Sequence, residues 1–130
     1  MLAFLCKMKE VAILNIIVFE DDQGRRDSME KVIVKSKPEA CIVTFATSDM
    51  LLEFAKKTNP EVAFISIESA DGRGYFTVKA LKKISPKTNV IVIASQCRYM
   101  QELIHLRISG YVTGELTKDI VTEELANLRY

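Results

Sequence analysis

Three consecutive carboxylates, Glu20, Asp21 and Asp22, directly follow an apolar run at residues 14–19. Like charges this close repel one another unless a cation or a positive group binds between them, or water screens them. Carboxylate oxygens are ligands that Mg²⁺ prefers in proteins. The cluster therefore predicts a site for a hard cation or, alternatively, a solvated loop in which Asp22 caps the next helix.

Five short runs rich in β-branched residues predict the strands that position this cluster, at residues 14–19, 41–45, 62–67, 90–94 and 111–112. After each run, apolar residues recur at intervals of three and four, which is typical of amphipathic helices. The central runs contain no polar alternation, so we expect strands that are covered on both faces. Five such units in succession predict a parallel sheet between two helix layers, a three-layer α/β/α sandwich.

Ligands of such sheets bind outside the carboxyl ends of the strands. We therefore expect the functional residues among those that end the predicted strands: residues 20–22, Thr47, residues 66–71, residues 94–95 and residues 113–115. Arg25 and Arg26 open the first predicted helix. We expect both to be solvated, with contact to an anionic group at this edge as the alternative.

Length and composition argue against several other classes of protein. The chain has 130 residues, 48% hydrophobic and 27% charged, with a net charge of +1. These values predict one globular domain. Residues 1–12 precede the first predicted strand, and we expect them to form a short extension in which Met8 is a candidate natural start, with the domain at residues 13–130. The even charge balance argues against nucleic-acid binding by this domain alone. No apolar run reaches the length of a membrane span. Three cysteines without a CxxC pattern predict reduced thiols and a cytoplasmic protein.

Three segments carry a resemblance to a known family. IIVFEDD at residues 16–22, PEVAFISIE at residues 60–68 and GYVT at residues 110–113 resemble the first, third and fifth strands of response-regulator receiver domains, the CheY-like fold of two-component signalling. The resemblance implies a five-stranded parallel sheet in the flavodoxin-like order 2-1-3-4-5, with Mg²⁺ ligands at Glu20 and Asp21. The closing LANLRY is similar to the receivers of LytTR-type regulators, which precede a DNA-binding domain. We expect a stand-alone receiver or a chain cut at a domain boundary.

The chain departs from the receiver pattern at the positions that handle phosphate. The family's phosphoacceptor aspartate matches Ser66, whose hydroxyl is a poor nucleophile without an adjacent base. The family's lysine matches Gly114. Its switch hydroxyl matches Ala94 or, after a shift of one residue, Ser95, and its aromatic switch residue matches Tyr111.

Loss of the acceptor and the lysine together removes groups on which phosphoryl transfer depends. We therefore expect a degenerate, phosphorylation-independent receiver that is not an enzyme and needs no cofactor, with weak Mg²⁺ binding as the one exception. By resemblance, it binds a protein partner or a second copy through its fourth helix, fifth strand and fifth helix. The alternative is a Mg²⁺-dependent phosphorylatable switch with a relocated acceptor, such as Asp71. A flavodoxin-like electron carrier is disfavoured, because no phosphate-cradling loop follows the first strand.

Overall fold

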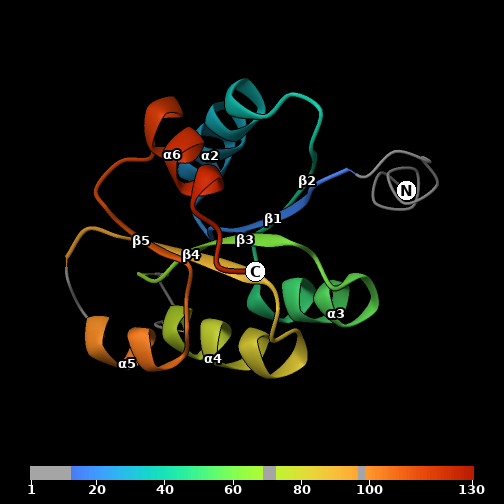
Figure 1. The fold of residues 1–130 in the computed structure, drawn as a ribbon, viewed down its shortest axis with the longest axis vertical. Helices are drawn as coiled ribbons and strands as arrows, with labels where there is room; N and C mark the ends of the chain where they lie inside the picture. The colour runs from blue at the N-terminus through green and yellow to red at the C-terminus, as the bar shows by residue number, and fades with distance from the viewer. Residues whose placement is uncertain (1–12, 69–72, 97–98) are drawn as a thin grey trace.

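The computed structural model describes residues 13–68, 73–96 and 99–130. Within them, strands and helices alternate along the chain (Figure 1). The elements are β1 (Asn15–Phe19), α2 (Gln23–Ser36), β2 (Cys41–Phe45), α3 (Ser48–Thr58), β3 (Val62–Ser66), α4 (Gly74–Ile84), β4 (Asn89–Ala94), α5 (Met100–His105), β5 (Gly110–Thr113) and α6 (Lys118–Ala126). The predicted extension at residues 1–12 lies outside the described residues.

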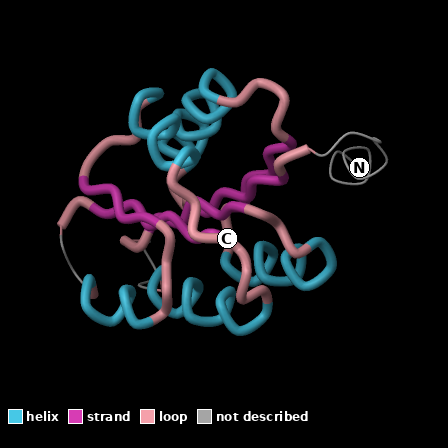
Figure 2. The backbone as a smooth tube through the Cα atoms, viewed as in Figure 1, coloured by secondary structure: helices cyan, strands magenta, loops and turns pink. Residues whose placement is uncertain are grey.

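The five strands form one parallel sheet in the order β2-β1-β3-β4-β5. Helices α2 and α6 cover one face of this sheet, and α3, α4 and α5 cover the other (Figures 1 and 2). The predicted three-layer α/β/α sandwich and its strand order are confirmed. The fourth and fifth helices of the sequence prediction correspond to α5 and α6.

The core consists of two apolar layers, one on each side of the sheet. Side chains alternate along a strand, so Ile16 and Val18 pack in the layer under α2 and α6, whereas Ile17 and Phe19 pack in the layer over α3, α4 and α5. The exposed fraction of each of these four side chains is at most 1%. Burial on both faces explains why the strands read as continuous apolar runs.

Cys41 begins β2 and is buried and disulfide-bonded. The prediction of three reduced thiols is therefore wrong for this residue. The reason is geometric, because the spacing of cysteines along a sequence does not report which of them the fold brings within bonding distance. No helix among the described residues is both long enough and apolar enough to cross a membrane.

A buried asparagine at the start of β4 anchors the C-terminal segment to the sheet. The Asn89 side-chain Oδ1 accepts hydrogen bonds from Ser109 Oγ, the Arg129 amide and the Tyr130 amide, each at 2.8 Å. Its Nδ2 donates to the Glu61 carbonyl oxygen at 3.0 Å. Asn89 is only 2% exposed, so these partners replace the water that its amide loses on folding.

We expect Asn89→Ala to lower the free energy of unfolding by about 2 kcal/mol, because the substitution leaves buried donors and an acceptor unsatisfied. Urea unfolding followed by circular dichroism measures this change. Asn127→Ala is the matched control, because the exposed Asn127 amide makes a single hydrogen bond, to the Glu123 carbonyl oxygen. Equal destabilisation by the two substitutions would contradict the anchoring role of Asn89.

Candidate functional site

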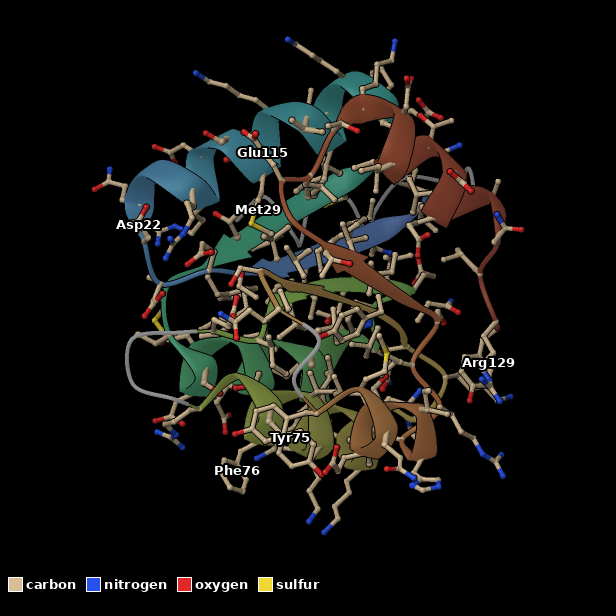
Figure 3. The ribbon with its side chains drawn as sticks, turned by 90° about the vertical axis from the view of Figure 1, so that its left-hand side faces the viewer. Asp22, Met29, Tyr75, Phe76, Glu115 and Arg129 are labelled. Atoms are coloured by element: carbon tan, nitrogen blue, oxygen red, sulfur yellow. The ribbon has the colours of Figure 1, made fainter. Side chains whose placement is uncertain are left out.

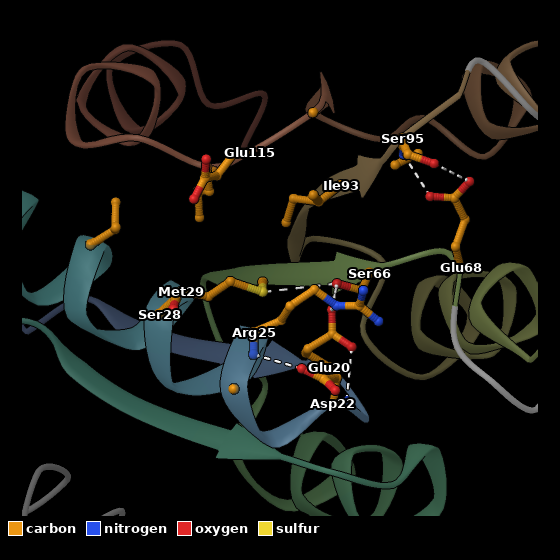
Figure 4. A pocket seen from close by; sticks show the side chains of 15 residues that line it. Glu20, Asp22, Arg25, Ser28, Met29, Ser66, Glu68, Ile93, Ser95 and Glu115 are labelled. Atoms are coloured by element: carbon orange, nitrogen blue, oxygen red, sulfur yellow. Dashed lines mark hydrogen bonds and ion pairs between the residues drawn. The ribbon is translucent and has the colours of Figure 1, made fainter.

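The carboxyl ends of four strands meet at one edge of the sheet. The register pairs Phe19 with Ile65, Ser66 with Ile93, and Ala94 with Thr113. The residues that end or directly follow these strands therefore lie side by side. A cavity of about 940 Å³ opens at this edge, and its lining includes Glu20, Ser66, Ala94, Ser95 and Gly114 (Figure 4).

Glu20 is the buried charge of this site, with 3% of its surface exposed. Its Oε1 accepts a hydrogen bond from Ser66 Oγ at 2.7 Å and lies 3.3 Å from Arg25 Nε. Its Oε2 accepts a hydrogen bond from the Asp22 amide at 3.0 Å. The carboxylate is therefore compensated by one guanidinium and two hydrogen bonds (Figure 4).

The three consecutive carboxylates do not share one role. Asp22 is exposed and caps α2, because its Oδ2 accepts a hydrogen bond from the Arg25 amide at 2.9 Å. The predicted capping role of Asp22 is confirmed. The neighbouring Arg26 Nη1 donates to the main-chain carbonyl oxygen of Glu20 at 2.9 Å.

Among the described residues, no group of three or more His, Cys, Asp or Glu side chains has an arrangement that would hold a metal ion.

Arg25 is the residue whose role the sequence left open. The guanidinium reaches back from the first turn of α2 onto Glu20, while 67% of the Arg25 side chain remains exposed. The contact is the alternative anticipated for this arginine, and solvation alone does not describe it. The signal in the sequence was the position of an arginine five residues after an acidic residue that directly follows an apolar run.

Ser66 ends β3 with 6% of its surface exposed. Its hydroxyl donates to Glu20 and lies 3.8 Å from the Met29 Sδ atom of α2. A carboxylate that already binds a guanidinium is a poor general base, so this contact orients the hydroxyl rather than activating it as a nucleophile. Asp71, the candidate relocated acceptor, lies outside the described residues.

Ser95 and Tyr111, the two side chains predicted as switch equivalents, both make hydrogen bonds near this edge. Ser95 donates from its amide and its hydroxyl to the Glu68 carboxylate, at 2.6 and 2.8 Å. Tyr111 donates from its hydroxyl to the Gln96 carbonyl oxygen at 2.8 Å. Ala94, the alternative position for the switch hydroxyl, is buried at the end of β4.

Gly114, which the resemblance to receivers matches with a lysine, directly follows β5. Its φ of 96° lies in the left-handed region that favours glycine. A Cβ atom placed on Gly114 would meet no atom within 4 Å, and Gly114 is one of the residues that line the cavity. The space beside this residue is therefore open.

Two curated relatives share distant sequence similarity with the chain, which matches no family model. The transcriptional regulatory protein DesR of Bacillus subtilis is 25% identical over 115 residues, covering 88% of this chain and 56% of DesR. The sensory transduction protein LytT of Bacillus anthracis is 19% identical over 113 residues, covering 87% of this chain and 46% of LytT. The chain thus spans about half the length of the curated relatives that it matches.

Solved receiver structures share the fold over most of the chain. The CheY-like receiver domain protein from Methanospirillum hungatei superposes with a TM-score of 0.77 at 14% identity, covering 88% of this chain and 92% of that chain. Vibrio cholerae CheY4 gives a TM-score of 0.77 at 15% identity, with coverages of 88% and 98%. The chain therefore has the fold of CheY-like receiver domains, and it shares distant sequence similarity with two curated regulatory proteins.

Proposed function

We propose that the chain is a degenerate receiver of two-component signalling that acts in the cytoplasm without being phosphorylated and serves as a protein-interaction module. The observation that carries this proposal is the contact between Ser66 and Glu20. The residue at the acceptor position donates a hydrogen bond to a carboxylate that already binds Arg25. Both groups are thereby engaged with partners inside the protein.

Phosphoryl transfer depends on an acceptor oxygen and on positive charge that stabilises the transferred group. Ser66 supplies a neutral hydroxyl in place of a carboxylate. Gly114 supplies no ammonium group, and open space lies where its side chain would begin. These two differences support the proposal that the chain neither accepts a phosphoryl group nor stabilises its transfer.

The residues present fit Mg²⁺ poorly. Glu20 is one of the two candidate ligands, but its Oε1 binds Arg25 and Ser66, and its Oε2 binds the Asp22 amide. Mg²⁺ would have to displace the guanidinium and would find a neutral hydroxyl at the third position. In this proposal the Arg25 guanidinium supplies the positive charge at Glu20, and Asp21 alone does not hold the ion.

The partner surface that we propose comprises α5, β5 and α6. On α5, Leu103 is fully buried, whereas Ile104 on the neighbouring helical row is 60% exposed. Tyr99, just before α5, is 49% exposed and stacks on Tyr75 of α4 with ring centroids 5.0 Å apart. Figure 3 shows Tyr75 at the α4 side of the molecule, across the sheet from Met29 and Glu115. Exposed apolar side chains of this size favour burial against a partner or a second copy.

We expect incubation with acetyl phosphate and Mg²⁺ to leave the intact mass of the chain unchanged, because both the acceptor carboxylate and the lysine are missing. Mass spectrometry of the native chain and of Ser66→Ala measures this outcome. A phosphorylatable receiver treated in the same way verifies the reagent. A mass increase of one phosphoryl group in the native chain would contradict the proposal, and its persistence in Ser66→Ala would place the acceptor elsewhere.

Arg25→Gln should increase the affinity of the chain for divalent cations, because it removes the positive charge that compensates Glu20. Mn²⁺, titrated as a paramagnetic substitute for Mg²⁺ and followed by amide NMR line broadening, measures the change. Lys35→Gln, in the last turn of α2, is the control for loss of one positive charge on the same helix. Tight Mn²⁺ binding by the native chain, unaffected by Arg25→Gln, would show that the guanidinium does not exclude the metal.

Ile104→Glu should weaken self-association or partner capture while the fold persists, because this side chain is exposed on the proposed surface. Light scattering over a concentration series and pull-down with matched variants measure the effect. Val34→Glu on α2 is the control, since Val34 is 43% exposed on the opposite side of the sheet. The proposed surface is wrong if the native chain is always monomeric and both variants capture the same proteins as the native chain.

A further inference from the structure

We propose that the cavity at the carboxyl edge binds a small organic cation, an amine or guanidine that carries an apolar chain or ring. The inference rests on the proposed function, because a receiver that held a lysine and a phosphoryl group at this edge would fill part of the space. The cavity measures about 940 Å³. Sites for small molecules usually measure about 300–1,000 Å³, so a compact organic ligand fits this volume.

The walls of the cavity give it an apolar character on two sides. Met29 and Val32 contribute from α2, Ile93 from β4, and Leu116 from the segment between β5 and α6. Gly114 leaves the space next to this wall open, because no atom lies within 4 Å of the position that its Cβ would take. Such a lining favours a hydrocarbon chain or ring over a strongly hydrated ion.

The charged residues of the lining favour a ligand of positive charge. Four carboxylates, Glu20, Asp22, Glu68 and Glu115, line the cavity against the single guanidinium of Arg25, which leaves three negative charges. Arg25 is already bound to Glu20, so an incoming anion would meet no unpaired cation. An incoming ammonium or guanidinium group would instead reduce the repulsion among the carboxylates.

Glu115 is the carboxylate best placed to receive this ligand. It is exposed, and it faces the cavity from the segment after β5, opposite Met29 and Ser28 of α2 (Figure 4). By contrast, Glu68 is held by two hydrogen bonds from Ser95. A cation that bridges α2 and Glu115 would contact the connection between β5 and α6, two elements of the proposed partner surface.

Three aromatic probes of similar size test the inference: phenethylamine, phenethyl alcohol and hydrocinnamate, which carry positive, zero and negative charge at neutral pH. Amide NMR spectra of the full chain record binding. We expect phenethylamine to cause saturable shifts at the amides of Met29, Val32 and Leu116, the alcohol to bind more weakly, and the carboxylate to cause no such shifts. Equal shifts with the carboxylate, or no shift of cavity amides with the amine at millimolar concentration, would overturn the inference.

Glu115→Lys should weaken phenethylamine binding about threefold to tenfold, which is the range expected when one exposed ion pair becomes a repulsion. Glu123→Lys is the matched control, because Glu123 is exposed on α6 and is not part of the cavity lining. Equal affinities of the two variants would overturn the assignment of the cation to Glu115. The readout is independent of phosphorylation, so absent amine binding refutes this inference alone, whereas a phosphoryl adduct refutes the proposed function.

Discussion

The burial of the Glu20 carboxylate at the end of β1 is the constraint on which the functional edge depends. An isolated charge at 3% exposure costs several kcal/mol unless groups of the protein compensate it. The compensation comes from three places along the chain: the hydroxyl of Ser66 on β3, the amide of Asp22, and the guanidinium of Arg25 on α2. A single carboxylate therefore fixes the position of the β3 end and the path by which the chain leaves β1 and enters α2.

Arg25 takes part both in the N-terminal cap of α2 and in the contacts of the buried Glu20 carboxylate. Its amide donates to the capping carboxylate of Asp22, which sets the start of α2, and its guanidinium binds Glu20. Met29 follows one helical turn later on the same face and lies 3.8 Å from Ser66 Oγ. The helix that supplies the internal cation thus also supplies a wall of the cavity, so the charge and the shape of this edge are set together.

The fold could be predicted from the sequence because the strands are buried on both faces, and a run such as Ile16 to Phe19 admits no amphipathic alternative. The positions of Ser66 and Gly114 at the strand ends followed from the same pattern. The choice of Glu20 as the partner of Arg25 did not follow, and neither did the Cys41 disulfide, because each depends on distances that only the packed chain determines. The cavity is likewise a property of packing, since it exists where no side chain at Gly114 fills the space.

An internal guanidinium differs from a bound metal ion in one respect that matters for signalling. A metal ion dissociates, and its binding can be coupled to phosphorylation, whereas Arg25, which contacts Glu20, is covalently part of the chain. A ligand shifts an equilibrium only through a difference in its affinity for two states. In the proposed function, an edge that carries its own cation lacks the difference that binding of a metal ion and a phosphoryl group would supply. Under the proposed function, regulation enters through a group that the protein does not already supply, either at the open space beside Gly114 or at the surface of α5, β5 and α6.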